Sequence, residues 1–236
     1  MRALKAEVTP TIEEYLEAIY RLQSKQGIAK TSEIVEALKV AIGTVTNTVE
    51  RLERDGLLIH EPYKGVKLTK KGLELALKIV RRHRLSEKLL TDFIGLDWAR
   101  AHEEACRLEH GIGDYVADRL EEVLGNPRTC PHGNPIPTRT GKIHEQEAIP
   151  LRDATIGEDL EIVRVSEEDE DMLQYLNSLS LKPGVALRVG EKAPFDGPIT
   201  LIVSGRRHSI GNKIASLLWV KPLERRGGEG GSMGIE

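Results

Sequence analysis

Apolar residues recur every three or four positions through the first 55 residues, in three runs that short polar turns separate. This spacing puts the apolar side chains of each run on one face and predicts three amphipathic helices. Thr11, with Glu14 three positions later, forms a capping box that predicts the start of the first helix. The apolar runs are 12–22, 34–38 and 45–52, and the third helix is predicted over 44–55, with Gly56 as its end.

A pair of short apolar stretches follows, 57–61 and 66–69, on either side of a turn that contains Pro62 and Gly65. Two strands joined by a glycine-containing turn predict a β-hairpin. A hairpin directly after a helix, a short turn and another helix is the order of a winged helix-turn-helix. That motif places its second helix in the major groove of DNA.

Thr69 begins a long helix that runs without internal proline to about Phe93, and two shorter helices are predicted over 97–110 and 113–124. The loop that follows, 129–140, is rich in proline and glycine, which excludes a regular helix or a central strand. Apolar residues of these helices are candidates for subunit contact in a homodimer, or equally for an intramolecular core. They are Leu89, Leu90, Phe93, Ile94, Val116 and Leu120.

The second half of the chain changes to short runs typical of strands, with a helix predicted over 169–178 and a helical turn over 214–218. Several short strands within about seventy residues predict a small barrel. The five predicted strands are 160–165, 186–189, 199–203, 208–210 and 219–221.

These elements predict an α+β protein of several domains. A winged helix-turn-helix domain occupies 1–75, and a helical dimerisation and metal-binding domain occupies 76–140. A linker over 141–148 leads to the small β domain, 149–223, and the glycine-rich tail, 224–236, is expected to be disordered.

Composition narrows the class of protein. Hydrophobic residues make up 39% of the chain and aromatic residues only 4%, so aliphatic side chains must fill the cores. No apolar run approaches the roughly 18 residues of a membrane span, and two cysteines are few for a secreted disulfide scaffold. We therefore expect a cytoplasmic protein with reduced thiols and no membrane partner, although the sequence leaves a Cys106–Cys130 disulfide open. Cys130 and His132 are either metal ligands or parts of an ordered loop.

Charge is distributed unevenly along a chain with a formal net charge of −3. Residues 60–84 carry eight Lys or Arg against two Glu, a net +6, whereas residues 145–181 carry eleven acids against two Arg, a net −9. A basic segment that includes the hairpin favours contact with DNA phosphates, although a small helical domain without a ligand is the alternative. The predicted DNA contacts are Thr44, Thr46, Asn47, Thr48, Arg51, Lys64 and Lys67.

The stretch from Ala101 to His110 carries metal-ligand side chains at helical spacing. Because a helix turns about 100° per residue, four of these side chains fall within an arc of about 100°. Nitrogen, sulfur and oxygen donors on one face indicate a transition-metal site, and a polar face with incidental histidines is the alternative. The four are His102, Cys106, Glu109 and His110, and His83 with Glu87 on the long helix are candidate partners.

Three blocks of sequence, 82–90 (RHRLSEKLL), 102–110 (HEEACRLEH) and 132–137 (HGNPIP), resemble the diphtheria toxin repressor family of metal-dependent transcriptional regulators. The resemblance extends from Thr11 to about Leu223. It implies a winged helix-turn-helix, a helical dimerisation domain with two metal sites, and a C-terminal SH3-like barrel related to FeoA domains. It further implies a homodimeric repressor of metal-homeostasis genes that binds a double-stranded DNA operator, with a metal ion as its only small ligand.

The resemblance also implies the role of individual residues. Cys106, Glu109 and His110 match the primary, regulatory metal site, to which the first helix adds Glu14. The ancillary metal site is matched by His83, Glu87 and His102. The barrel of the family lends an acid and an amide to this site, and the nearest match is Asp169 with Met172, with Asp171 or Glu168 as alternatives. Arg84 and Asn134 match positions that hold an anion beside the ancillary metal, where Cys130 replaces a small hydroxyl residue.

Glu14 and Cys106 mix two types found within this family. Iron-sensing relatives have Met at the position of Glu14, whereas manganese-sensing relatives have acids at the positions of Glu14, Glu17 and Cys106. A thiolate favours Fe²⁺, Co²⁺, Ni²⁺ or Zn²⁺ over Mn²⁺. We therefore expect Fe²⁺ as the cofactor ahead of Mn²⁺, with Co²⁺, Ni²⁺ or Zn²⁺ as substitutes in vitro.

Two other functions use the same residues. A metallohydrolase would need an open metal position beside a general base, but the chain has no nucleophile motif, so we expect no enzyme. A winged-helix regulator whose switch is not metal would leave the ligand-type residues structural. In the favoured interpretation, a metal joins the first helix to the dimerisation domain and sets the two recognition helices of a dimer about 34 Å apart.

Overall fold

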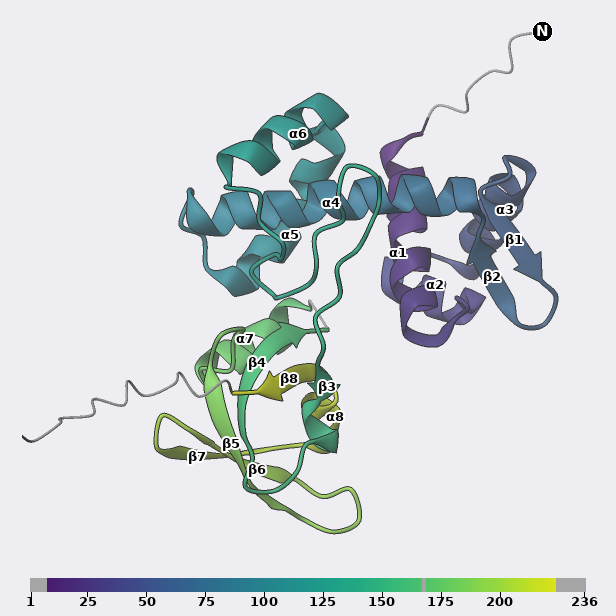
Figure 1. Ribbon diagram of the computed structural model, residues 1–236. Coiled ribbons are helices and arrows are strands. Elements are labelled where there is room, and N and C mark those ends of the chain that lie inside the picture. Colours follow the sequence, from purple (N-terminus) through teal and green to yellow (C-terminus); the bar gives the residue numbers. More distant parts are fainter. Residues whose placement is uncertain (1–7, 167–168, 224–236) are drawn as a thin grey trace, which may run out of the picture. The chain divides into compact units, whose positions relative to one another are not determined.

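The computed structural model describes residues 8–166 and 169–223, so the predicted disordered tail lies outside the described residues. The chain divides into two compact units: Met1–Cys130 with Pro135–His144, and Pro131–Asn134 with Glu145–Glu236. The first unit is helical and carries a hairpin, and the second contains a six-stranded sheet (Figure 1). No described helix is long and apolar enough to cross a membrane.

The first unit begins with the predicted three helices and hairpin. The first helix starts earlier than predicted, because Thr9 rather than Thr11 is its N-cap and accepts a bond from the Ile12 amide (3.4 Å). Pro10 then takes the first helical position, where its missing N–H is not needed. The elements are α1 (Pro10–Gln26), α2 (Thr31–Leu38), α3 (Ile42–Arg54), β1 (Leu58–Glu61) and β2 (Gly65–Leu68).

One apolar core joins these five elements. Leu16 and Ile19 of α1, Ile34 of α2, Leu52 of α3 and Val66 of β2 are all fully buried in it. Because α3 turns Val45, Val49 and Leu52 inward, most of its polar residues face away from the core. A displacement of α1 therefore carries α2 and α3 with it.

The hairpin is fixed to the turn between α1 and α2. The Ala29 amide donates to the Val66 carbonyl (3.0 Å), and the Val66 amide donates to the Ala29 carbonyl (2.8 Å). Gly65 has φ 138°, and a Cβ on it would lie 2.3 Å from the Ala29 carbonyl oxygen. Only glycine allows this approach, which the sequence pattern did not indicate.

A single long helix, α4 (Lys70–Asp92), packs against α1 along one part and against α5 and α6 along another (Figure 1). Its start is fixed, because the Thr69 hydroxyl accepts from the Gly72 amide (3.1 Å) and the Thr69 amide donates to the Leu57 carbonyl (3.0 Å). Helix α4 thus connects the helix-turn-helix to the rest of the unit.

The predicted helix over 97–110 is regular only as α5 (Trp98–Leu108). Its last predicted residues form a 3₁₀ turn, η1 (Glu109–Gly111), before α6 (Asp114–Val123). Arg81 of α4 is buried and holds α6 through Asp118 (2.9 Å) and Glu121 (2.7 Å). The tighter turn changes where Glu109 and His110 point relative to a continued α-helix.

The second unit contains an antiparallel sheet with the strand order β3-β8-β4-β5-β6-β7. Alternate residues of its strands, with Leu173 and Leu176 of α7, form its buried interior. The five predicted strands are present, and the sequence missed β3 because two residues give no alternation. The elements are β3 (Ile149–Pro150), η2 (Leu151–Asp153), β4 (Asp159–Val165), α7 (Glu170–Ser178), β5 (Ala186–Lys192), β6 (Ile199–Val203), β7 (Arg206–Ile210), α8 (Asn212–Ala215) and β8 (Leu218–Pro222).

Four residues of the proline-rich loop, Pro131–Asn134, belong to the second unit. The Val165 amide donates to the His132 carbonyl (2.9 Å), and the Asn134 side chain donates to the Val165 carbonyl (3.2 Å). Gly133 has φ +81°, and a Cβ there would lie 1.9 Å from the Val163 carbonyl oxygen. The loop is therefore held to β4 by backbone contacts that need its glycine.

Gly72→Ala should destabilise the protein by about 1–3 kcal/mol. The added Cβ would lie 2.1 Å from the Leu57 carbonyl oxygen, which the Thr69 amide holds in place. The measurement is the urea midpoint of unfolding in the presence of chelator. Gly43→Ala in α3 makes the same change with nothing within 4 Å. It should be neutral or stabilise by up to about 1 kcal/mol. Equal midpoints for the two variants would contradict the close approach of α4 to the hairpin.

Candidate metal centre and DNA-binding surface

His83 of α4 lies at the centre of a group of ligand-type side chains in the first unit. Its ring is fully buried. Nδ1 lies 2.6 Å from Glu109 Oε2, and Nε2 lies 3.0 Å from Glu87 Oε1. Glu87 reaches the ring because it is four residues later on the same helix, and Glu109 comes from η1.

Helix α5 adds an imidazole and a thiol. His102 Nδ1 lies 3.0 Å from His83 Nε2 and 3.1 Å from Glu87 Oε1. Cys106 Sγ lies 3.8 Å from His102 Nε2 and 3.9 Å from His83 Nδ1. The i, i+4 spacing predicted from the sequence therefore does bring His102 and Cys106 together on the face of α5 that meets α4.

Helix α1 contributes carboxylates, but not the one predicted. Glu14 is exposed, whereas Glu13 Oε2 lies 2.7 Å from His110 Nδ1 and its Oε1 lies 2.5 Å from Arg82. Glu17 is buried, and one of its oxygens lies within 4.8 Å of ligand atoms of His83 and Glu109. Glu13 and Glu17 share a face of α1 because they are four residues apart. Glu14 and Glu17, three residues apart, could share a face as well, so spacing alone does not choose between Glu13 and Glu14.

The two predicted ligand sets meet at one residue. His83, assigned to the ancillary set with Glu87 and His102, also contacts Glu109 and lies near Cys106, both assigned to the primary set. His110 of the primary set lies 3.6 Å from Glu109. In this structure the sets form one continuous cluster, which we call the His83 cluster: Glu13, Glu17, His83, Glu87, His102, Cys106, Glu109 and His110.

Burial and like charge set the protonation of the His83 cluster. Burial raises the pKa of Glu109 to about 7. The hydrogen bond with His83 lowers this pKa, and the negative charge of Glu17 raises it further. Although burial opposes it, the Arg21 guanidinium (2.8 Å) holds the pKa of Glu17 at about 2. Despite its burial, the charges of Glu87 and Glu17 raise the pKa of His83.

The thiol of Cys106 is acidified by its neighbours. Burial opposes its ionisation, but hydrogen bonds and positive charge from His102 and His83 outweigh burial and lower its pKa to about 6. A thiolate is the form that binds a metal. The lowered pKa therefore favours the thiolate, the metal-binding form of Cys106, at neutral pH.

The donor set fits a divalent transition metal. Two groups within the His83 cluster each bring three ligand atoms to within 4.8 Å of one another: His83, His102 and Cys106 in one, and Glu17, His83 and Glu109 in the other. Imidazole, thiolate and carboxylate converge from three helices and a 3₁₀ turn, as such a metal requires. A buried excess of acidic side chains over cationic ones further favours a bound cation.

The remaining predicted ligands are placed separately. Arg84 donates to the Pro135 carbonyl within the first unit. Asn134 belongs to the second unit, where it binds the Val165 carbonyl, and Asp169 is exposed there as the N-cap of α7, accepting from the Met172 amide (3.2 Å). Each of these side chains therefore has a local protein partner.

The predicted DNA-contacting residues lie on the outer face of α3 and on the hairpin. Thr44, Thr46, Asn47 and Arg51 are exposed, and Thr48 is half-buried. The Thr46 hydroxyl donates to the Ile42 carbonyl (3.0 Å), so its methyl group rather than its proton is available to a partner. On the hairpin, Lys64 is exposed, and half-buried Lys67 pairs with Glu61 (2.8 Å).

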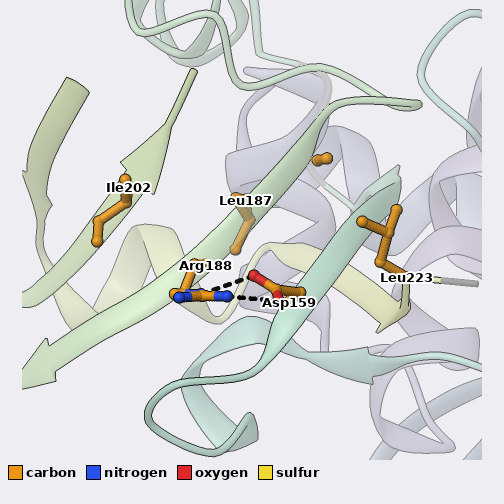
Figure 2. Close-up of a pocket in the computed structure, with 6 residues that line it drawn as sticks. Asp159, Leu187, Arg188, Ile202 and Leu223 are labelled. Atoms are coloured by element: carbon orange, nitrogen blue, oxygen red, sulfur yellow. Dashed lines mark hydrogen bonds and ion pairs between the residues drawn. The ribbon is translucent and has the colours of Figure 1, made fainter. Parts of the chain in front are cut away.

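A surface pocket of about 300 Å³ on the sheet of the second unit is a less suitable ligand site (Figure 2). Of the described residues that line it, the charged ones are Asp159 and Arg188. They bind each other through two bonds of 2.7 and 2.6 Å, which raise the pKa of Arg188. Its charged groups are already satisfied by one another.

Sequence models of three domain families match the chain in order. The N-terminal DNA binding domain of iron dependent repressors matches residues 7–66, and their metal binding and dimerisation domain matches residues 69–138. The FeoA domain matches residues 149–222. The matched segments include every element of the His83 cluster.

Whole relatives match along most of their length. The chain is 36% identical over 214 residues to the iron-dependent repressor IdeR of Mycobacterium tuberculosis, covering 86% of this chain and 92% of that protein. It is 38% identical over 226 residues to the diphtheria toxin repressor of Corynebacterium efficiens, covering 92% and 98%.

Solved structures support the same fold. A manganese-dependent transcriptional repressor in complex with manganese superposes with a TM-score of 0.83 at 32% identity, covering 89% of this chain and 99% of that one. IdeR of T. acidophilum superposes with a TM-score of 0.77 at 28% identity, covering 94% and 100%.

In metal-free protein, Cys106 should be half ionised near pH 6. An unperturbed thiol is half ionised at about pH 8.5. The rate of alkylation against pH, measured in a Cys130→Ala background, reports this single thiol. His102→Ala should move the midpoint toward the ordinary value, whereas Glu104→Ala, an exposed change on the same helix, should leave it in place. A midpoint near 8.5 before any change at His102 would refute the acidified thiol.

Proposed function

This chain belongs to the family of iron-dependent repressors, metal-dependent proteins that bind DNA, and we propose that it represses metal-homeostasis genes when Fe²⁺ is bound. One observation carries the proposal. Carboxylates of α1, a helix of the DNA-binding domain, meet the imidazoles, thiol and carboxylates of α4, α5 and η1 in a single buried cluster. A cation held there would fix the DNA-binding domain to the helices behind it.

Two ligand sets within the His83 cluster are proposed. Cys106, Glu109 and His110, with a carboxylate of α1, form the regulatory set, for which Glu14 is the sequence candidate and Glu13 and Glu17 the acids that face the cluster. His83, Glu87 and His102 form the ancillary set. Asp169, Arg84 and Asn134 remain candidates for the ancillary metal and its anion. A bound cation would supply the positive charge that offsets the negative charge of these acidic side chains.

Protein groups perform the switch itself. Without a cation, carboxylates of α1 and η1 repel one another, and protons on Glu109 and His83 reduce that repulsion. Ligation requires His83 to lose its proton, whereas the lowered pKa of Cys106 already favours the thiolate at neutral pH. Because α1 shares its core with α2 and α3, the position of Glu13 and Glu17 determines the position of the recognition helix.

The thiol supports Fe²⁺ over Mn²⁺ as the effector. Thiolate ligands suit Fe²⁺, Co²⁺ and Zn²⁺ better than Mn²⁺, for which oxygen ligands are preferred. Of the two relatives compared by sequence, one is an iron-dependent repressor and the other is a diphtheria toxin repressor. One structural neighbour, in contrast, is a manganese-dependent repressor in complex with manganese. Cys106 is therefore the residue on which the choice of metal depends.

A homodimer supplies the second recognition helix. Five large apolar side chains just after α4 and on α6 are exposed, and we assign them to the subunit contact. Two helices must stand about 34 Å apart to enter successive major grooves of DNA. The exposed residues are Phe93, Ile94, Tyr115, Val116 and Val123.

Binding to a promoter of a metal-uptake gene from its own genome should appear only with metal. We expect Fe²⁺, titrated anaerobically, to support binding at a lower free concentration than Mn²⁺, because the site contains a thiolate. Fluorescence anisotropy of the labelled fragment measures binding, and a coding-region fragment of equal length is the control. Equal binding in excess chelator would refute the metal switch and favour a regulator with another effector.

Glu17→Gln should raise the metal concentration needed for DNA binding by at least about 10-fold, because it removes a buried charge from the cluster. Glu36→Gln makes the same change on the exposed surface of α2 and should have no effect. The same assay compares the two adjacent acids of α1. A larger effect of Glu13→Gln would support the contact with His110, and a larger effect of Glu14→Gln would support the prediction from sequence.

A further inference from the structure

Cys130 is a buried thiol beside the His83 cluster that the proposed regulatory and ancillary sets do not use. It follows α6 in the first unit, is 4% exposed, and forms no disulfide. Its Sγ lies within 4.8 Å of a carboxylate oxygen of Glu87. A structural cysteine usually lies in an apolar pocket, whereas Cys130 lies near the buried carboxylate of Glu87.

Glu87 connects this thiol to two imidazoles. Its Oε1 lies 3.0 Å from His83 Nε2 and 3.1 Å from His102 Nδ1, and the Glu87 side chain is fully buried. One sulfur, one carboxylate and two imidazole nitrogens thus come from three segments, α4, α5 and the loop after α6. Four donors of these types are what a tetrahedral site for Zn²⁺ or a similar ion uses.

We infer that Cys130 is a thiolate ligand of a metal held by His83, Glu87 and His102, so that the ancillary site selects a soft divalent cation. The inference rests on the proposed function of the His83 cluster and adds a ligand to it. On binding, the Cys130 S–H bond breaks, a sulfur–metal bond forms, and the proton passes to solvent. A hard, oxygen-preferring ion such as Mn²⁺ would gain little from the sulfur.

The chain has two cysteines, so thiolate–metal bonds can be assigned one at a time. The probe is Co²⁺, added anaerobically to metal-free, full-length protein, because cobalt–thiolate bonds give a charge-transfer band in the near ultraviolet. Four proteins are compared: wild type, Cys106→Ser, Cys130→Ser and the double variant. Equilibrium dialysis measures the bound Co²⁺ in each, and circular dichroism verifies its fold.

We expect Cys106→Ser to keep part of the band, Cys130→Ser to lose part of the wild-type intensity, and the double variant to lose the band. We also expect Cys130→Ser to weaken the retention of Co²⁺ by at least about 10-fold while leaving that of Mn²⁺ nearly unchanged. The Cys130→Ser comparison stands even where Cys106→Ser does not fold.

Two other outcomes overturn the inference and separate it from the proposed function. A band and Co²⁺ retention in Cys130→Ser equal to wild type, with no band in folded Cys106→Ser, leaves the metal-binding cluster intact and Cys130 outside it. No band and no retained Co²⁺ in wild type removes the metal-binding function together with the inference.

Discussion

The burial of like charge around one imidazole is the constraint on which the first unit depends. Glu17, Glu87 and Glu109 are all buried, and each approaches His83. Carboxylates removed from water cost several kcal/mol each unless a positive charge or a proton compensates them. Arg21 compensates Glu17, the raised pKa of Glu109 favours a proton on that carboxyl, and the raised pKa of His83 favours a positive charge beside Glu87. The apolar cores on either side fix the helices that enforce this arrangement.

That constraint couples ion binding to the geometry of the helix-turn-helix. Helix α1 carries Glu13 and Glu17 toward the His83 cluster, and Leu16 and Ile19 in the apolar core that it shares with α2 and α3. A change in the attraction between α1 and the cluster is therefore transmitted through packed side chains rather than through a flexible linker. Coupling of this kind is reciprocal, so the DNA that favours one placement of α3 also favours ion binding.

The sequence predicted what periodicity determines. It located the α-helices, the hairpin and five of the six strands of the second unit's sheet. It also brought His102 and Cys106 to one face, because an i, i+4 pair on a helix must share a face. It named Glu14 as the ligand from the first helix, whereas Glu13 is the acid that contacts His110, because residues three and four before Glu17 can both share its face. That choice is made by Arg82, which is 69 residues away in sequence and pairs with Glu13. The sequence also did not predict the Ala29–Val66 bridge or the contact of His83 with both ligand sets, for the same reason. They depend on tertiary packing, which no local pattern contains.

The mixture of donors is the physical basis of the Fe²⁺ preference proposed above. Sites of nitrogen, oxygen and sulfur bind Mn²⁺ most weakly and Cu²⁺ most strongly among the divalent first-row ions, so affinity alone would never select Fe²⁺. Carboxylates of α1 and η1 reduce the advantage of the softer, later ions, and the acidified Cys106 thiol reduces the competitiveness of Mn²⁺. The 3₁₀ turn places Glu109 between His83 and His110, so the hard and soft donors lie in one cluster rather than in two separate sites. In the proposed switch, the approach of α1 to that turn brings the carboxylates of α1 to the cluster and moves the core that α1 shares with the recognition helix.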